Sequence, residues 1–237
     1  MVGARTMAMA LNRLIDWRID ALNPRTQNRH LPKGLVKPWE TLLLALLGLG
    51  LLVYAGLRLN PLTARLLPVA VFFLTFYSYT KRFTWLCHYV LGLTIGAAAA
   101  GGWIAVTGSF APTAYWLWAG VGLWIAGFDI LYATQDFAFD RAHGVQSVPA
   151  RFGIPRALAV ARATHLLAWM AFLQAGLAYG AGAFYYLGLF LVGGLLLVEH
   201  RLVSPEDLSR VEVAFFQANV GVSLGMFLFI ALDLWLA

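Results

Sequence analysis

Two groups of acidic and polar residues stand at helical spacing along the chain. The first recurs every four residues and consists of Asn12, Asp16 and Asp20. The second is separated by steps of three, four and four and consists of Asp129, Tyr132, Asp136 and Asp140. Each group lines one face of a helix. Close carboxylates repel one another unless a cation compensates, and such oxygen ligands suit Mg²⁺. The two groups therefore favour a site for Mg²⁺.

Basic residues adjoin both groups. Lys81 and Arg82 are the last two residues of the segment Tyr77-Ser78-Tyr79-Thr80-Lys81-Arg82, and Arg141 directly follows Asp140. Two facing aspartate groups can hold a diphosphate through bridging Mg²⁺, since this ion binds readily between carboxylates and phosphate oxygens. We expect Lys81, Arg82 and Arg141 to take up the rest of the diphosphate charge. For Lys81 and Arg82, a positively charged membrane anchor is the alternative.

Asp129 is the deepest acidic residue of the second group, about one or two turns inside an apolar segment. A carboxylate within a membrane is costly and usually marks function. Asp16, Asp20 and Asp140, taken singly, are compatible with solvated loop positions. Their joint arrangement on two faces favours a binding site.

The surrounding sequence is that of a membrane protein, because 61% of the residues are apolar and only 12% are charged. A crossing helix takes roughly 20 residues. The fold class expected is an all-α, polytopic transmembrane helical bundle, forming a single domain over residues 1–237. Its predicted spans are 39–57, 62–80, 84–106, 112–134, 157–179, 182–201 and 212–234. The apolar residues from Met1 to about Leu11 are too few to cross, and indicate either the second half of a truncated span or an interfacial helix.

The basic residues gather on one side of these spans. Alternate loops contain fourteen of them, namely Arg13, Arg18, Arg25, Arg29, Lys33, Lys37, Lys81, Arg82, Arg141, Arg151, Arg156, Arg162, Arg201 and Arg210. Such an excess places that side, with both aspartate groups, in the cytoplasm. The formal charge of +6 is therefore a topology signal, and we expect the lipid bilayer and no nucleic acid as a partner.

In combination, these motifs resemble the UbiA-type membrane prenyltransferases over essentially the whole chain. The first matching run is Asn12 to Asp20, followed by Asn23-Pro24-Arg25-Thr26, Arg29 and Leu31-Pro32-x-Gly34. The second is Asp129 to Arg141, continuing through Gly144 and Ser147 to Gly153. Tyr77 to Arg82 and Ala214-Phe215-Phe216 with Asn219 also fit. Two departures stand out. Arg13 replaces an aspartate common in the family and is expected either to bind diphosphate or to face away, and two of the family's nine spans are absent or partial.

The resemblance implies an Mg²⁺-dependent transfer of a polyprenyl group from polyprenyl diphosphate to a small aromatic acceptor. The metal ligands and catalytic residues that it implies are Asp16, Asp20, Asp136 and Asp140. The first choice of acceptor is 4-hydroxybenzoate, in ubiquinone or related quinone biosynthesis at the bacterial inner membrane. An alternative is the futalosine menaquinone pathway, whose prenyltransferases the run from Ala4 to Asp20 also resembles. The substrate-binding residues implied are Arg5 for an acceptor carboxylate, Asn219 for a hydrogen bond to the acceptor, and Asn12, Arg25, Lys81, Arg82, Asp129, Tyr132 and Arg141. For Arg5 and Asn219, packing or boundary roles are equally compatible.

Two other classes remain as alternatives. An ion-coupled transporter would use intramembrane carboxylates near the bilayer midplane, whereas these acids gather at one surface. A phosphatidyltransferase would need a different run of residues between its acids. The five histidines have no metal-ligand spacing and are interpreted as boundary or packing residues: His30, His88, His143, His165 and His200.

Overall fold

The computed structural model describes residues 1–236, with the side chain of Phe215 outside the described part. In these residues the regular structure is helical, and seven helices are long and apolar enough to cross a membrane. The predicted all-α polytopic bundle is confirmed, and the chain is an integral membrane protein. The sequence match at Ala214-Phe215-Phe216 falls partly outside the described side chains.

The helices follow one another with short connections. In chain order they are α1 (Val2–Leu22), α2 (Pro38–Leu59), α3 (Pro61–Thr80), α4 (Cys87–Thr107), α5 (Pro112–Ala133), η1 (Thr134–Asp136), α6 (Phe137–His143), α7 (Val148–Phe152), α8 (Ile154–Tyr179), α9 (Ala183–Leu202), α10 (Val211–Val213), η2 (Ala214–Ala218) and α11 (Asn219–Leu236). The seven predicted spans match seven of these positions within a few residues. Prolines in the first turn begin α2, α3, α5 and α8, where a missing N–H leaves no bond unmade.

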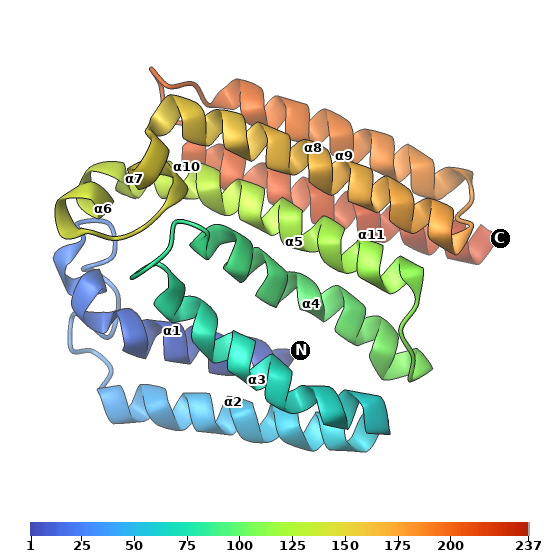
Figure 1. Ribbon diagram of the computed structural model, residues 1–237, viewed down its shortest axis with the longest axis horizontal. Helices are drawn as coiled ribbons and strands as arrows, with labels where there is room; N and C mark the ends of the chain where they lie inside the picture. The colour runs from blue at the N-terminus through green and yellow to red at the C-terminus, as the bar shows by residue number, and fades with distance from the viewer. Residues whose placement is uncertain (237) are drawn as a thin grey trace.

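The first helix differs from the expected apolar stub. α1 is one continuous helix of 21 residues that includes Asn12, Asp16 and Asp20. Figure 1 shows its first residues near the middle of the long axis, with its last turn at the end where α6 and α7 lie. It packs closely on α2, since a Cβ added at Gly48 would lie 2.6 Å from the backbone nitrogen of Met7.

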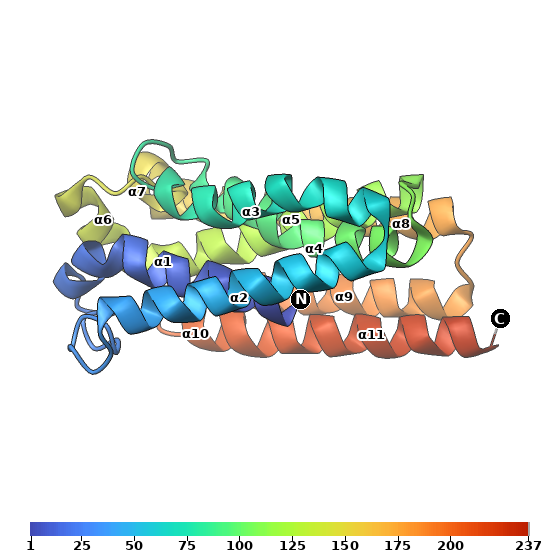
Figure 2. The ribbon, with the colours of Figure 1, turned by 90° about the horizontal axis from the view of Figure 1, so that it is seen from below.

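The helices run roughly parallel to one long axis, as both views show (Figures 1 and 2). One end holds the last turn of α1, the α3–α4 connection, α6 and α7, while the C-terminus lies at the opposite end. The connections at the first end contain most of the basic residues. Both aspartate groups therefore reach the same end of the bundle, as the alternation of the spans predicts.

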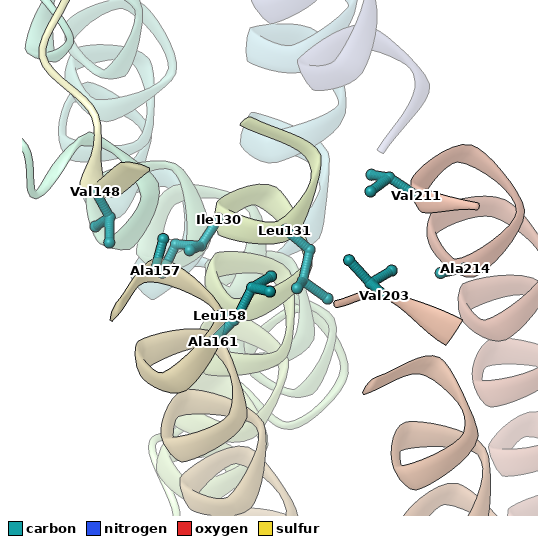
Figure 3. Close-up of a cluster of buried hydrophobic side chains, with 9 residues drawn as sticks. All are labelled: Ile130, Leu131, Val148, Ala157, Leu158, Ala161, Val203, Val211 and Ala214. Carbon is teal, nitrogen blue, oxygen red and sulfur yellow. The ribbon is translucent and has the colours of Figure 1, made fainter. Parts of the chain in front are cut away.

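A cluster of buried apolar residues lies directly beside the second aspartate group. It joins α5, α7, α8, α10 and the connections next to them through Ile130, Leu131, Val148, Ala157, Leu158, Ala161, Val203, Val211 and Ala214 (Figure 3). Ile130 and Val148 are fully buried. Because well-packed side chains resist displacement, this cluster fixes the direction in which the polar face of α5 points.

Candidate active site

Asp16 lies at the centre of the first group. Its side chain is only 2% exposed and accepts hydrogen bonds or ion pairs from three sides. Asn12 Nδ2 lies 2.9 Å from Oδ2, Lys81 Nζ lies 2.7 Å from the same oxygen, and Arg82 Nη2 lies 3.3 Å from Oδ1. The basic pair after α3 therefore faces the first aspartate group.

Asp20 is held one turn further along α1. Arg29 Nη1 lies 2.6 Å from its Oδ2, and Arg13 Nη1 lies 3.9 Å from the same atom. Burial, together with the charge of Arg29, lowers the pKa of the Arg13 guanidinium below its ordinary value. The sequence allowed Arg13 either to bind diphosphate or to face away from the site. In the structure its side chain points toward Asp20, so it does not face away.

Asp136 connects the second group to the loop that follows α1. Arg25 donates hydrogen bonds to both carboxylate oxygens of Asp136 through Nε and Nη2, and Asn23 Nδ2 donates to Oδ1 at 2.9 Å. The Arg25 backbone N–H donates to the Asn23 side chain at 2.9 Å, which closes a local turn and presents Arg25. Although burial lowers the pKa of Arg25, the bonds to Asp136 raise it above its ordinary value. The guanidinium lies 4.9 Å from the centroid of the Tyr132 ring.

Asp140 completes the second group from α6. Its Oδ2 accepts a hydrogen bond from Ser147 Oγ at 2.8 Å, and Lys81 lies near enough for its positive charge to act on the carboxylate. Lys81 therefore stands between Asp16 and Asp140. The Gln146 backbone N–H donates to the Lys81 carbonyl at 2.7 Å, which holds the basic pair beside the second group.

Asp129 lies deeper in the bundle, on the same face of α5 as Tyr132. Its Oδ2 is 2.6 Å from Nδ1 of His88, and its side chain is 29% exposed. The Tyr77 hydroxyl is near enough to both Asp129 and Asp16 to interact with their charges. Asp129 therefore lies beside His88 and Tyr77, further along α5 from the bundle end than Asp136 and Asp140.

Two predicted site residues, Arg141 and Arg5, make none of the aspartate contacts described above, and a third, Asn219, lies on α11. Arg141 is exposed, with its guanidinium 5.6 Å from the centroid of the Phe137 ring. Arg5 is exposed on α1, and Asn219 is half-buried at the first residue of α11.

The sequence reasoning did not single out several residues that contact the aspartates. Asn23 donates to Asp136 and Ser147 donates to Asp140. His88, which the sequence analysis interprets as a boundary or packing residue, has its Nδ1 2.6 Å from Asp129 Oδ2. Asn23 and Ser147 lie within the sequence motifs that resemble the family, so the sequence already indicated that they lie near the site. No sequence motif indicated a site role for His88, because its partner Asp129 is 41 residues away in the chain.

The donor set fits Mg²⁺. Within residues 1–236 no three acidic, cysteine or histidine side chains converge closely enough to hold a metal ion alone. Mg²⁺ does not need such a cage, because it takes one or two carboxylates together with water and substrate phosphate. Asp16 Oδ1 is buried and accepts no hydrogen bond, and its ion-pair partner is Arg82 Nη2 at 3.3 Å. A cation that displaced Arg82 would find a carboxylate oxygen there.

Known proteins are similar to this chain in sequence and in fold. A 4-hydroxybenzoate octaprenyltransferase from Nitrosospira multiformis is 33% identical over 93% of this chain and 76% of its own length. The solved structure of a UbiA homolog from Aeropyrum pernix K1 matches with a TM-score of 0.89 and 32% identity, covering 98% of this chain and 86% of that one. A UbiA homolog from Archaeoglobus fulgidus bound to DMAPP and Mg²⁺ has the same fold, with a TM-score of 0.60 and 18% identity over 95% of this chain and 83% of that one. The model of the UbiA prenyltransferase family matches residues 1–229. The chain therefore belongs to the UbiA prenyltransferase family.

Proposed function

We propose that the chain transfers a polyprenyl group from polyprenyl diphosphate to 4-hydroxybenzoate, in the biosynthesis of ubiquinone or a related quinone. The observation that carries this proposal is the joining of two aspartate groups at one end of a membrane bundle, with Arg25 and Asn23 bridging to Asp136. The Nitrosospira relative, named for octaprenyl transfer to 4-hydroxybenzoate, supports the choice of acceptor.

The diphosphate would be held between the two groups. Asp16, Asp20, Asp136 and Asp140 would hold Mg²⁺, which supplies a positive charge that stabilises the departing diphosphate. The Archaeoglobus homolog, bound to DMAPP and Mg²⁺, supports this cofactor. Lys81, Arg82 and Arg25 already contact these carboxylates. On substrate binding they can turn to phosphate oxygens and stabilise the charge that grows as the allylic C–O bond breaks.

The apolar interior below the aspartates would receive the isoprenoid tail. Water there would quench an allylic cation, so a dry wall is needed for transfer to carbon. The acceptor would lie below the diphosphate, next to Asp129 and Tyr132, with Asn12 between it and Asp16. Arg5 is assigned to the acceptor carboxylate and Asn219 to a hydrogen bond with the acceptor, while Arg141 is assigned to the diphosphate from the protein surface.

The charge distribution supports a location in the bacterial inner membrane with the site open to the cytoplasm. The connections at the aspartate end contain most of the basic residues, and such loops stay on the cytoplasmic side. A cavity of about 290 Å³ opens at this end, lined in part by Lys81, Arg82 and Phe139. It offers a route by which a diphosphate headgroup reaches the basic pair.

The test is transfer of a labelled prenyl diphosphate to 4-hydroxybenzoate in membranes that contain the full chain. We expect product with Mg²⁺, none after chelation, and recovery when Mg²⁺ is restored. Asp136→Ala should lose product, whereas Asp207→Ala, which changes an exposed acid outside the site, should retain it. Product with a menaquinone-pathway acceptor and not with 4-hydroxybenzoate would replace the acceptor. Inactivity with all acceptors, combined with ion flux driven by a gradient, would refute prenyl transfer.

A further inference from the structure

His88 is a buried histidine with both ring nitrogens engaged. The residue is 3% exposed at the start of α4. The Val148 backbone N–H lies 3.2 Å from Nε2, and Asp129 Oδ2 lies 2.6 Å from Nδ1. A backbone N–H can only donate, so Nε2 must be the accepting nitrogen. The proton of the neutral ring then sits on Nδ1 and is donated to Asp129, which fixes the tautomer from the surrounding geometry.

His88 cannot itself touch a substrate, because it is buried and has no nitrogen left over. Asp129, in contrast, is half-buried and uses one carboxylate oxygen for His88. Its other oxygen accepts no hydrogen bond that the described residues show. Asp129 precedes Asp136 by seven residues, which corresponds to about 10 Å along a helix. That depth suits a group acting on the acceptor ring rather than on the diphosphate.

The segment from Gln146 to Val148 fixes this arrangement. Beyond the bond to His88, its Ser147 hydroxyl donates to Asp140 at 2.8 Å. The Cys87 thiol donates to the Gln146 carbonyl at 3.3 Å, immediately before His88 in the chain. Val148 itself is fully buried in the apolar cluster. One rigid segment thus sets the ring of His88 and, through it, the plane of the Asp129 carboxylate.

We propose that His88 is a positioning residue that holds Asp129 as the base for the aromatic acceptor. This inference rests on the proposed function. In the step concerned, the prenyl carbon forms a bond to the ring carbon, and the C–O electron pair leaves with the diphosphate. The hydrogen on the attacked ring carbon then passes as a proton to the open oxygen of Asp129, and its bonding pair returns to the ring. The Nδ1–H of His88 stays in place, favours the charged carboxylate before the step, and keeps its open oxygen aimed at the acceptor.

The experiment compares the parent chain with His88→Ala, His88→Asn, Asp129→Asn and the double change His88→Ala with Asp129→Asn. We expect His88→Ala to lower kcat about 10- to 100-fold, as for other residues that orient a reacting group. KM for both substrates should stay near the parent value. His88→Asn should recover part of the loss, because its amide nitrogen can replace the Nδ1 donor. The double variant should be no slower than Asp129→Asn alone.

An isotope effect separates positioning from a general loss of folding. A ring-deuterated acceptor should slow His88→Ala more than it slows the parent, because proton removal becomes the slow step. Equal isotope effects in the parent and in His88→Ala would overturn the inference. So would an equal fall in kcat when His88→Ala is added to the parent and to Asp129→Asn. If His88→Ala does not accumulate, the same comparison is made with His88→Asn. Activity in the parent that is unchanged by either His88 variant refutes this inference alone, whereas a parent inactive on every acceptor refutes the proposed function and this inference with it.

Discussion

The contact between α4 and α5 offers a sharp test, because the two helices meet backbone to backbone. A Cβ added at Gly92 would lie 2.1 Å from the Gly122 carbonyl oxygen, where real Cβ contacts stay above 3.0 Å. Gly92→Ala must therefore part the helices by about 1 Å. Overpacking of this kind costs about 1–3 kcal/mol of stability.

The same displacement reaches the site. His88 stands one turn before Gly92 on α4, and Asp129 stands two turns after Gly122 on α5, so parting the helices stretches the 2.6 Å bond between them. A shift of about 1 Å takes this bond beyond the range of a good hydrogen bond. Misplacing reacting groups by that distance can cost about 10²-fold in rate.

The assay measures thermal unfolding and prenyl transfer of the purified, detergent-solubilised chain. Gly101→Ala is the matched control, since it lies on the same helix with no atom within 4 Å of an added Cβ. It should leave activity unchanged and add up to about 1 kcal/mol through helix propensity. If Gly92→Ala unfolded at the parent temperature and kept the parent rate, the close contact of α4 and α5 would be disproved.

Two further changes separate stability from substrate binding. Asp233 on α11 accepts hydrogen bonds from the Gly182 N–H at 2.8 Å and the Tyr185 N–H at 3.2 Å, so it caps α9 at the end opposite the site. Asp233→Ala should therefore lower the free energy of unfolding by about 1–2 kcal/mol, measured by thermal unfolding, and leave kcat unchanged. A lower kcat in a fully folded variant would contradict this assignment. Arg25→Ala should raise KM for the prenyl diphosphate about 10-fold or more, while its partly exposed ion pair contributes only about 0–1 kcal/mol to stability. Arg18→Ala, an exposed arginine on α1, is the control, and equal KM changes in both variants would contradict a specific role for Arg25.

The helices themselves were largely predictable, because their boundaries are set by local chemistry. Prolines begin several of them, and Gly108 and Gly180 end α4 and α8 with positive φ angles of 66° and 75°. α1 was harder. Its apolar first half and its polar second half were treated as separate segments, yet no proline or glycine interrupts the chain between Gly3 and Leu22, and one helix results.

The residue pairs of the site were less predictable, because they join distant segments. Periodicity placed Asp16 and Asp136 on helix faces, but nothing local indicates that Arg25 pairs with an aspartate 111 residues away. Arg141 shows the converse. Its position next to Asp140 predicts a role in binding diphosphate, but the sequence does not indicate that the guanidinium also packs on the Phe137 ring.

Pairing of the aspartates with basic side chains bears on how the enzyme turns over. Mg²⁺ arriving alone would face Lys81, Arg82 and Arg25, and diphosphate arriving alone would face Asp16, Asp20 and Asp136. If both arrived together, the metal would take the place of the basic side chains and the diphosphate that of the carboxylates. We therefore expect metal and diphosphate each to raise the affinity for the other by the same factor. After transfer, re-formation of the internal ion pairs would compete with the bound diphosphate and its metal and would favour their release from the site.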